Sequence, residues 1–189
     1  MNQDNTTSRL THLGLMTALV FAANYARIVL PVSIGGNTAF TLANIICCLS
    51  GLVLGPAGGL ASGLGSALYD LTNPIYAAEC WITFLTKGAM GLAAGLACAG
   101  LMRRGEGSYG KYLFSTVVGC VCYYALYFLK TFLISGLFAA EGSAALGTAA
   151  ILSKIPASVF NASVAIAAAP PLAIVLNNAL RRAGLHKPN

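Results

Sequence analysis

Long apolar stretches dominate this sequence and restrict the folds that are open to it. They cover residues 10–31, 39–54, 57–71, 81–102, 112–137 and 149–180. A helix that crosses a hydrocarbon core about 30 Å thick needs about 20 mainly apolar residues. Only 8% of the residues are charged and 57% are hydrophobic, which a water-exposed globular surface does not tolerate. The sequence therefore predicts an all-α membrane protein, a single domain over residues 1–189 with six transmembrane helices.

The first three of these stretches raise questions of their own. The first follows a short polar leader and is longer than the apolar core of a signal peptide, so we interpret it as a mature helix. The second and third are short for a bilayer. Tilted, re-entrant or shielded helices remain open for both.

Basic residues in the connections indicate the orientation, because short cytoplasmic loops carry an excess of Lys and Arg. The connection over residues 103–111 contains three of them, and the tail after residue 180 contains another three. The connections 32–38, 72–80 and 138–148 contain none. An even number of spans places both termini on the same side, so we expect the N- and C-termini in the cytoplasm.

Four basic side chains lie inside the apolar stretches or at their ends: Arg27, Lys87, Lys130 and Lys154. A charge at the centre of a membrane helix costs at least about 2.5–3.5 kcal/mol, so it usually faces a cavity or a substrate path. On the expected topology all four lie in the outer half of the bilayer. They predict a polar, anion-accepting pocket that opens to the outside.

Simpler interpretations of these charges stay open. Arg27 and Lys154 are placed where long side chains can snorkel to the headgroups. The two deeper lysines have Asp70 and Glu79 as possible ion-pair partners.

Small residues recur every four positions in the first stretch, at Gly14, Ala18, Ala22 and Ala26. This spacing places them on one stripe of a helix, where another helix can approach closely. The stripe serves either internal packing or the docking of a separate subunit. Glycines 51, 55, 59 and 63 repeat the spacing, but Pro56 interrupts the helix, so they do not form one straight stripe.

Several functional classes find no support in the sequence. The six cysteines show no C-x-x-C pattern and have no intramembrane histidine beside them, so we expect no metal site. There is no H-E-x-x-H motif and no Walker motif. An intramembrane serine protease would need a histidine that faces a serine within the membrane, and the sequence places no histidine there. The net charge of +6 is scattered among the spans, which argues against nucleic-acid binding. We expect no catalytic residues and no cofactor.

The chain resembles the S components of energy-coupling factor (ECF) transporters, which import vitamins into prokaryotes, and most closely their riboflavin-type branch. The motifs that carry the resemblance are the stripe Ala18, Ala22 and Ala26 and the segments 31–36, 50–59, 65–71 and 86–88. The similarity is most distinctive in the first half. The last two helices match mainly by hydropathy.

The resemblance implies that the chain is the substrate-capture subunit of an importer in a prokaryotic cell membrane. A vitamin would bind at the extracellular side, in a pocket near Arg27, Asn37, Lys87, Lys130, Lys154 and Asn161. A transmembrane scaffold subunit would dock on Ala18, Ala22 and Ala26, and two ATPase subunits would supply the energy.

The sequence does not identify the ligand, but it restricts the ligand's chemistry. The outer cations suit a carboxylate, and aromatic residues on the same side could stack on a flat ring. A heteroaromatic or carboxylate vitamin, riboflavin among them, would fit, although riboflavin is neutral. Tyr76 and Trp81 could equally belong to an interfacial belt. A stand-alone secondary transporter of a small organic solute is the main rival function.

Overall fold

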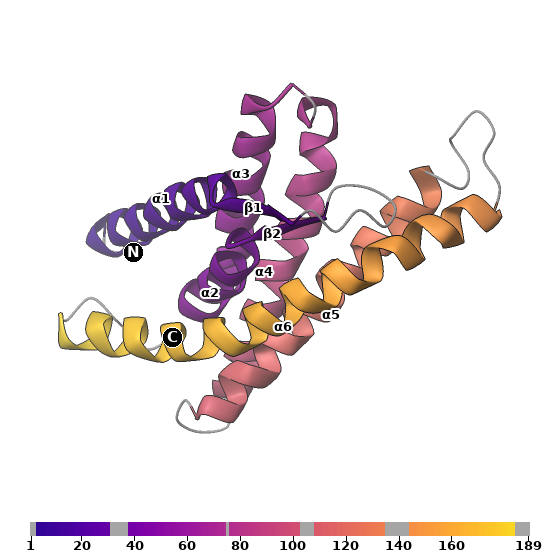
Figure 1. The fold of residues 1–189 in the computed structure, drawn as a ribbon. Coiled ribbons are helices and arrows are strands. Elements are labelled where there is room, and N and C mark those ends of the chain that lie inside the picture. Colours follow the sequence, from indigo (N-terminus) through magenta and orange to yellow (C-terminus); the bar gives the residue numbers. More distant parts are fainter. Residues whose placement is uncertain (1–2, 31–37, 75, 103–107, 135–143, 184–189) are drawn as a thin grey trace.

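The computed structural model describes residues 3–30, 38–74, 76–102, 108–134 and 144–183, and its helices are arranged as shown in Figure 1. Helices α5 and α6 run side by side, and α3 and α4 form a second close pair. The α-helices are α1 (Gln3–Tyr25), α2 (Ala43–Leu54), α3 (Gly58–Thr72), α4 (Cys80–Met102), α5 (Tyr109–Phe132) and α6 (Ala144–Arg182). Short 3-10 helices η1 (Gly55–Ala57) and η2 (Ala77–Glu79) precede α3 and α4, and strands β1 (Arg27–Leu30) and β2 (Thr38–Thr41) follow α1.

Four helical segments are long and apolar enough to cross a membrane. Within the part of the chain that the structure describes, they are Ala43–Thr72, Ala77–Met102, Tyr109–Phe132 and Ala144–Arg182. The first of them contains both α2 and α3. Helix lengths are very uneven, because α2 has 12 residues and α6 has 39.

The prediction that residues 10–31 and 39–54 are helical throughout is wrong where the two segments approach each other. Helix α1 ends at Tyr25, and β1 pairs antiparallel with β2 in a register that places Arg27 opposite Thr41. The strand RIVL contains β-branched residues, which pack well in strands. A short apolar run does not reveal by periodicity whether it is a strand or the end of a helix.

The ends of the later helices also differ from the predicted limits. Helices α3 and α4 begin and end within one residue of the expected positions. Helix α6, in contrast, begins at Ala144, five residues before the predicted start. Lys154 is therefore about three turns into α6, deeper than its place five residues after the predicted start.

Helix α3 buries a polar face inside the protein and exposes an apolar face. On α3, Ser62 and Ser66 are completely buried and Asp70 is nearly so. The opposite face of the same helix exposes Leu60, Leu64, Leu68 and Leu71. Exposed apolar surface on this scale marks contact with lipid or with another protein. Together with the apolar helices, this distribution defines a multi-pass membrane protein.

Helices α2 and α3 fold back on each other as a hairpin. The hydroxyls of Ser50 and Ser62 lie 2.7 Å apart, and Ser62 Oγ lies 3.1 Å from the Cys47 carbonyl oxygen. The turn between the helices includes Gly55, which has a φ of 64°, a conformation that glycine adopts without strain. Buried hydroxyl contacts therefore hold the two short helices together.

The hairpin packs on α4 through glycines from both of its arms. A Cβ added to Gly51 of α2 would lie 2.3 Å from the Gly91 carbonyl oxygen, and one added to Gly63 of α3 would lie 2.8 Å from the Phe84 carbonyl oxygen. Glycines 51, 55, 59 and 63 do not share one straight helix, as expected, yet the structure places all four against α4. Small residues permit this close backbone approach.

We predict that Gly95→Ala destabilises the protein by about 1–3 kcal/mol, the usual cost of overpacking. The added Cβ would lie 2.2 Å from the Gly55 carbonyl oxygen, a backbone atom that cannot move aside freely. Thermal unfolding in detergent measures the effect. Gly100→Ala is the matched control, because it lies in the same helix and a Cβ there meets nothing within 4 Å. Equal melting temperatures for the two variants would contradict the prediction.

Candidate ligand-binding site

Lys87 is the most deeply buried of the three lysines among the predicted site residues. It lies about two turns into α4, and only 6% of its surface is exposed. Its Nζ donates a hydrogen bond to Asn44 Oδ1 of α2. The glycine contacts between α2 and α4 bring these two side chains together.

Tyrosines of α5 also belong to the surroundings of Lys87. The Lys87 ammonium lies 4.6 Å from the centroid of the Tyr123 ring. Asn44 Nδ2 donates a hydrogen bond of 3.2 Å to the Tyr124 hydroxyl. A cation over an aromatic face gains about 2 kcal/mol or more when water is excluded, so the ring offsets part of the cost of burying the charge.

A stack of tyrosine rings leads from Lys87 to Lys154. The rings of Tyr123 and Tyr127 are stacked, with centroids 5.9 Å apart and planes inclined by 21°. Lys154 of α6 lies 5.4 Å from the Tyr127 centroid. The two lysines, which come from different helices, thus both contact one aromatic surface. We call this set, Lys87, Lys154, Tyr123 and Tyr127, the tyrosine–lysine cluster.

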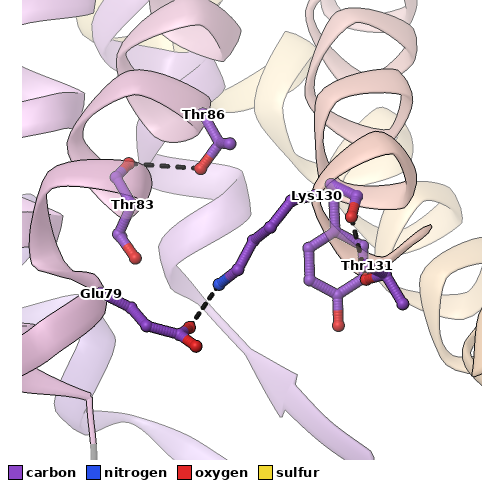
Figure 2. Close-up of polar contacts among 6 residues, drawn as sticks. Glu79, Thr83, Thr86, Lys130 and Thr131 are labelled. Carbon is purple, nitrogen blue, oxygen red and sulfur yellow. Dashed lines mark hydrogen bonds and ion pairs between the residues drawn. The ribbon is translucent and has the colours of Figure 1, made fainter. Parts of the chain in front are cut away.

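Lys130 has a carboxylate partner instead. It lies in the last turn of α5 and forms an ion pair with Glu79 at the end of η2 (Figure 2). This is the ion-pair alternative that the sequence left open for Lys130. Its charge is therefore partly neutralised within the protein.

Asn161 is buried in α6 and connects this helix to the small sheet. Its Oδ1 accepts a hydrogen bond of 3.3 Å from the Thr41 amide, and its Nδ2 donates one of 3.0 Å to the Ala157 carbonyl oxygen. Both ends of the amide are engaged within the protein. In this structure Asn161 positions β2 against α6.

The first connection contributes less to the described site. Arg27 begins β1, and its backbone pairs with that of Thr41, the residue bonded to Asn161. Arg27 thus belongs to the strand pair that α6 holds. Asn37 lies outside the described residues.

Sequence reasoning missed Asn44 and the tyrosines at 123, 124 and 127. The pattern Tyr123-Tyr124-x-x-Tyr127-Phe128 places several rings on one side of a helix, because residues three and four apart are neighbours. That spacing was the available signal. No sequence pattern indicated the hydrogen bond between Lys87 and Asn44, because the two residues are 43 positions apart.

Chemically, the cluster combines cations with aromatic faces and an amide. Such a set suits a flat ring together with a carboxylate or phosphate. The described residues contain no group of three or more His, Cys, Asp or Glu side chains placed to hold a metal ion.

The small-residue stripe lies on the outer surface of α1. Ala18 and Ala22 are exposed, and Ala26, one residue after the helix ends, is exposed as well. The opposite side of α1 is buried, with Val20 against Gly65 of α3. Internal packing therefore uses Val20 and its neighbours, and leaves the stripe uncovered.

Fold and site together define a small helical membrane protein that holds a buried lysine, an amide and tyrosine rings between its helices. A family model described as "ECF-type riboflavin transporter, S component" matches residues 4–178. The chain belongs to this family of transporter S components, which is not a family of enzymes.

A solved structure supports the fold. It is described as "Structure and mechanism of the S component of a bacterial ECF transporter", and it aligns with a TM-score of 0.60 over 94% of this chain and 97% of that chain. The sequences are 14% identical, so this likeness concerns the fold alone. A search of curated proteins found no match.

We predict that Asn44→Leu destabilises the protein by about 2 kcal/mol, because buried Lys87 loses a hydrogen-bond acceptor. In a Lys87→Met background the same change should cost at least about 1 kcal/mol less, because the charge that needed the acceptor is gone. A double-mutant cycle of thermal unfolding in detergent measures the difference. An equal cost in both backgrounds would show that the contact between the two side chains is energetically irrelevant.

Proposed function

We propose that this chain captures a vitamin or vitamin precursor at the extracellular side and delivers it together with a separate ECF scaffold and ATPase module. The observation that carries the proposal is the burial of Lys87 against Asn44 and the Tyr123 ring inside a protein of the S-component family. A membrane protein retains a buried cation mainly where it serves a substrate or an ion path.

The proposal includes a topology of six spans with both termini in the cytoplasm of a prokaryotic cell. The distribution of basic residues among the connections supports it. In Figure 1 the start of α1 and the end of α6 lie on the left, whereas the end of α5 and the start of α6 lie at the upper right. The cluster then occupies the outer half of the protein, within reach of the extracellular side.

The proposed ligand is a vitamin with a heteroaromatic ring, a carboxylate, or both. The stacked rings of Tyr123 and Tyr127 offer faces to a flat ring, and Lys87 and Lys154 offer charge to an anion. Riboflavin, which the family description names, would use the aromatic faces. A carboxylate vitamin would also use the lysines.

The coupling partners belong to the proposal as well. A transmembrane scaffold subunit docks on the exposed stripe of Ala18, Ala22 and Ala26, and two ATPase subunits drive import. Exposure of the stripe in α1 supports this role. Small side chains let a partner helix approach closely in a membrane, where packing replaces the hydrophobic effect.

We predict that Lys87→Ala weakens ligand binding at least tenfold while the protein remains folded, and that Lys130→Ala does so when the ligand carries an anionic group. Each change removes a charge from the proposed site, and Lys87 contacts the aromatic surface directly. Thermal-shift screening against a vitamin panel identifies the ligand, and titration gives the affinities. Lys111→Ala is the control, because it removes the same charge from the first turn of α5, at the other end of the helix. Unchanged affinity in both site variants would refute the pocket assignment.

A stand-alone secondary transporter, which is the rival function, would purify without scaffold or ATPase subunits. Purification with a scaffold and an ATPase pair supports the S-component role. Uptake of the ligand by the lone protein in liposomes, driven by an ion gradient, would favour the secondary transporter.

We predict that Ala18→Phe or Ala22→Phe abolishes co-purification of the scaffold but leaves ligand affinity within about twofold. A large ring on the stripe prevents close helix approach, and the stripe lies outside the cluster. Leu10→Phe is the control, because its side chain is also exposed on α1 but points about 80° away from Ala18 and about 120° away from Ala22. Retention of the scaffold by both alanine variants would exclude the stripe as the docking surface.

A further inference from the structure

The ion pair between Glu79 and Lys130 joins two elements at the outer end of the protein. Glu79 is the last residue of η2, directly before α4, and Lys130 lies in the last turn of α5. Figure 2 shows the lysine extended from its helix toward the carboxylate. The contact bridges 51 positions of sequence.

The pair lies next to the tyrosine–lysine cluster. Lys130 follows Tyr127 by three residues, so the two lie on the same side of α5. Thr131 Oγ1 donates a hydrogen bond of 2.9 Å to the Tyr127 carbonyl oxygen, within the same turn of helix. An anion held by Lys130 would thus lie beside the ring that Lys154 covers.

The two partners of the pair differ in their exposure. The Glu79 side chain is 42% exposed, whereas that of Lys130 is 20% exposed. A carboxylate that already contacts solvent gains hydration easily when it leaves. The more covered lysine would keep a poorly solvated charge and requires a replacement anion. Glu79 is therefore the partner that can be exchanged.

We propose that Glu79 is an internal counter-ion that competes with an anionic group of the ligand for Lys130 and so sets the specificity of the site. This inference rests on the proposed function. A carboxylate or phosphate on the ligand takes the place of the Glu79 carboxylate, which moves into water. A neutral ligand leaves the pair intact and gains nothing from Lys130. Glu79 thereby lowers the affinity for anionic ligands and leaves that for neutral ones unchanged.

The first test uses inorganic phosphate and does not require the natural ligand. Thermal stability of the purified full-length protein is titrated with phosphate at constant ionic strength, for wild type and Glu79→Gln. We expect the apparent phosphate affinity of the variant to be at least fivefold higher, because Lys130 has lost its internal carboxylate. Adding Lys130→Met to Glu79→Gln should abolish the gain.

A matched control separates this local effect from a change in net charge. Glu106→Gln removes one carboxylate from the connection between α4 and α5 and should leave the phosphate response at the wild-type level. The proposal is overturned if Glu79→Gln responds like wild type, if Glu106→Gln gains as much, or if the gain persists without Lys130. Any of those results would mean that Glu79 does not compete with phosphate for Lys130, and that the ion pair only connects η2 to α5.

The second test compares riboflavin with its 5′-phosphate, two ligands that share a ring system and differ by one anionic group. Glu79→Gln should raise the affinity for the phosphate ester relative to riboflavin at least fivefold. An unchanged ratio with both flavins bound would overturn the proposal. If no variant binds either flavin but the phosphate response still follows Glu79 and Lys130, the counter-ion role stands and a flavin ligand is excluded.

Discussion

The close contact between the α2–α3 hairpin and α4 is the constraint on which the rest of the structure depends. Side chains are absent at Gly51, Gly59 and Gly63, so the helix backbones approach directly. In a membrane there is no hydrophobic drive between helices, and close packing takes its place. The same approach lets Lys87 of α4 reach Asn44 of α2. Packing and the arrangement of the candidate site therefore depend on one interface.

Hydropathy predicted the limits of a helix well where polar residues flank its apolar run, and poorly where a strand continues the apolar run of a helix. Helix α4 was placed within one residue because Glu79 and the Arg103–Arg104 pair flank its apolar run. The strand Arg27–Leu30 was assigned to a helix because a run of only four residues carries no usable period. The sheet arises from pairing between distant segments, which no local pattern reveals.

The site was predictable in its charges but not in its partners. An intramembrane lysine is conspicuous in any sequence, so Lys87 and Lys154 were candidates at once, and Glu79 was foreseen as a possible partner of Lys130. Asn44 and Tyr123 drew no notice, because an amide at a helix start and a tyrosine in an apolar span are common. Their roles follow from contacts between helices, which depend on the packing angle and not on composition.

The unequal helix lengths have a consequence for the surrounding lipid. Helix α3, which carries the exposed leucine face of the hairpin, has 15 residues and is about 22 Å long. Helix α6, with 39 residues, is about 58 Å long, and the hydrocarbon core is about 30 Å thick. A bilayer adapts to such mismatch by thinning or thickening, and helices adapt by tilting, at a modest cost for each ångström. The acyl chains beside the hairpin therefore have to match a shorter apolar length than those beside α6. Lipid chain length becomes a variable that shifts the preferred tilt of this protein.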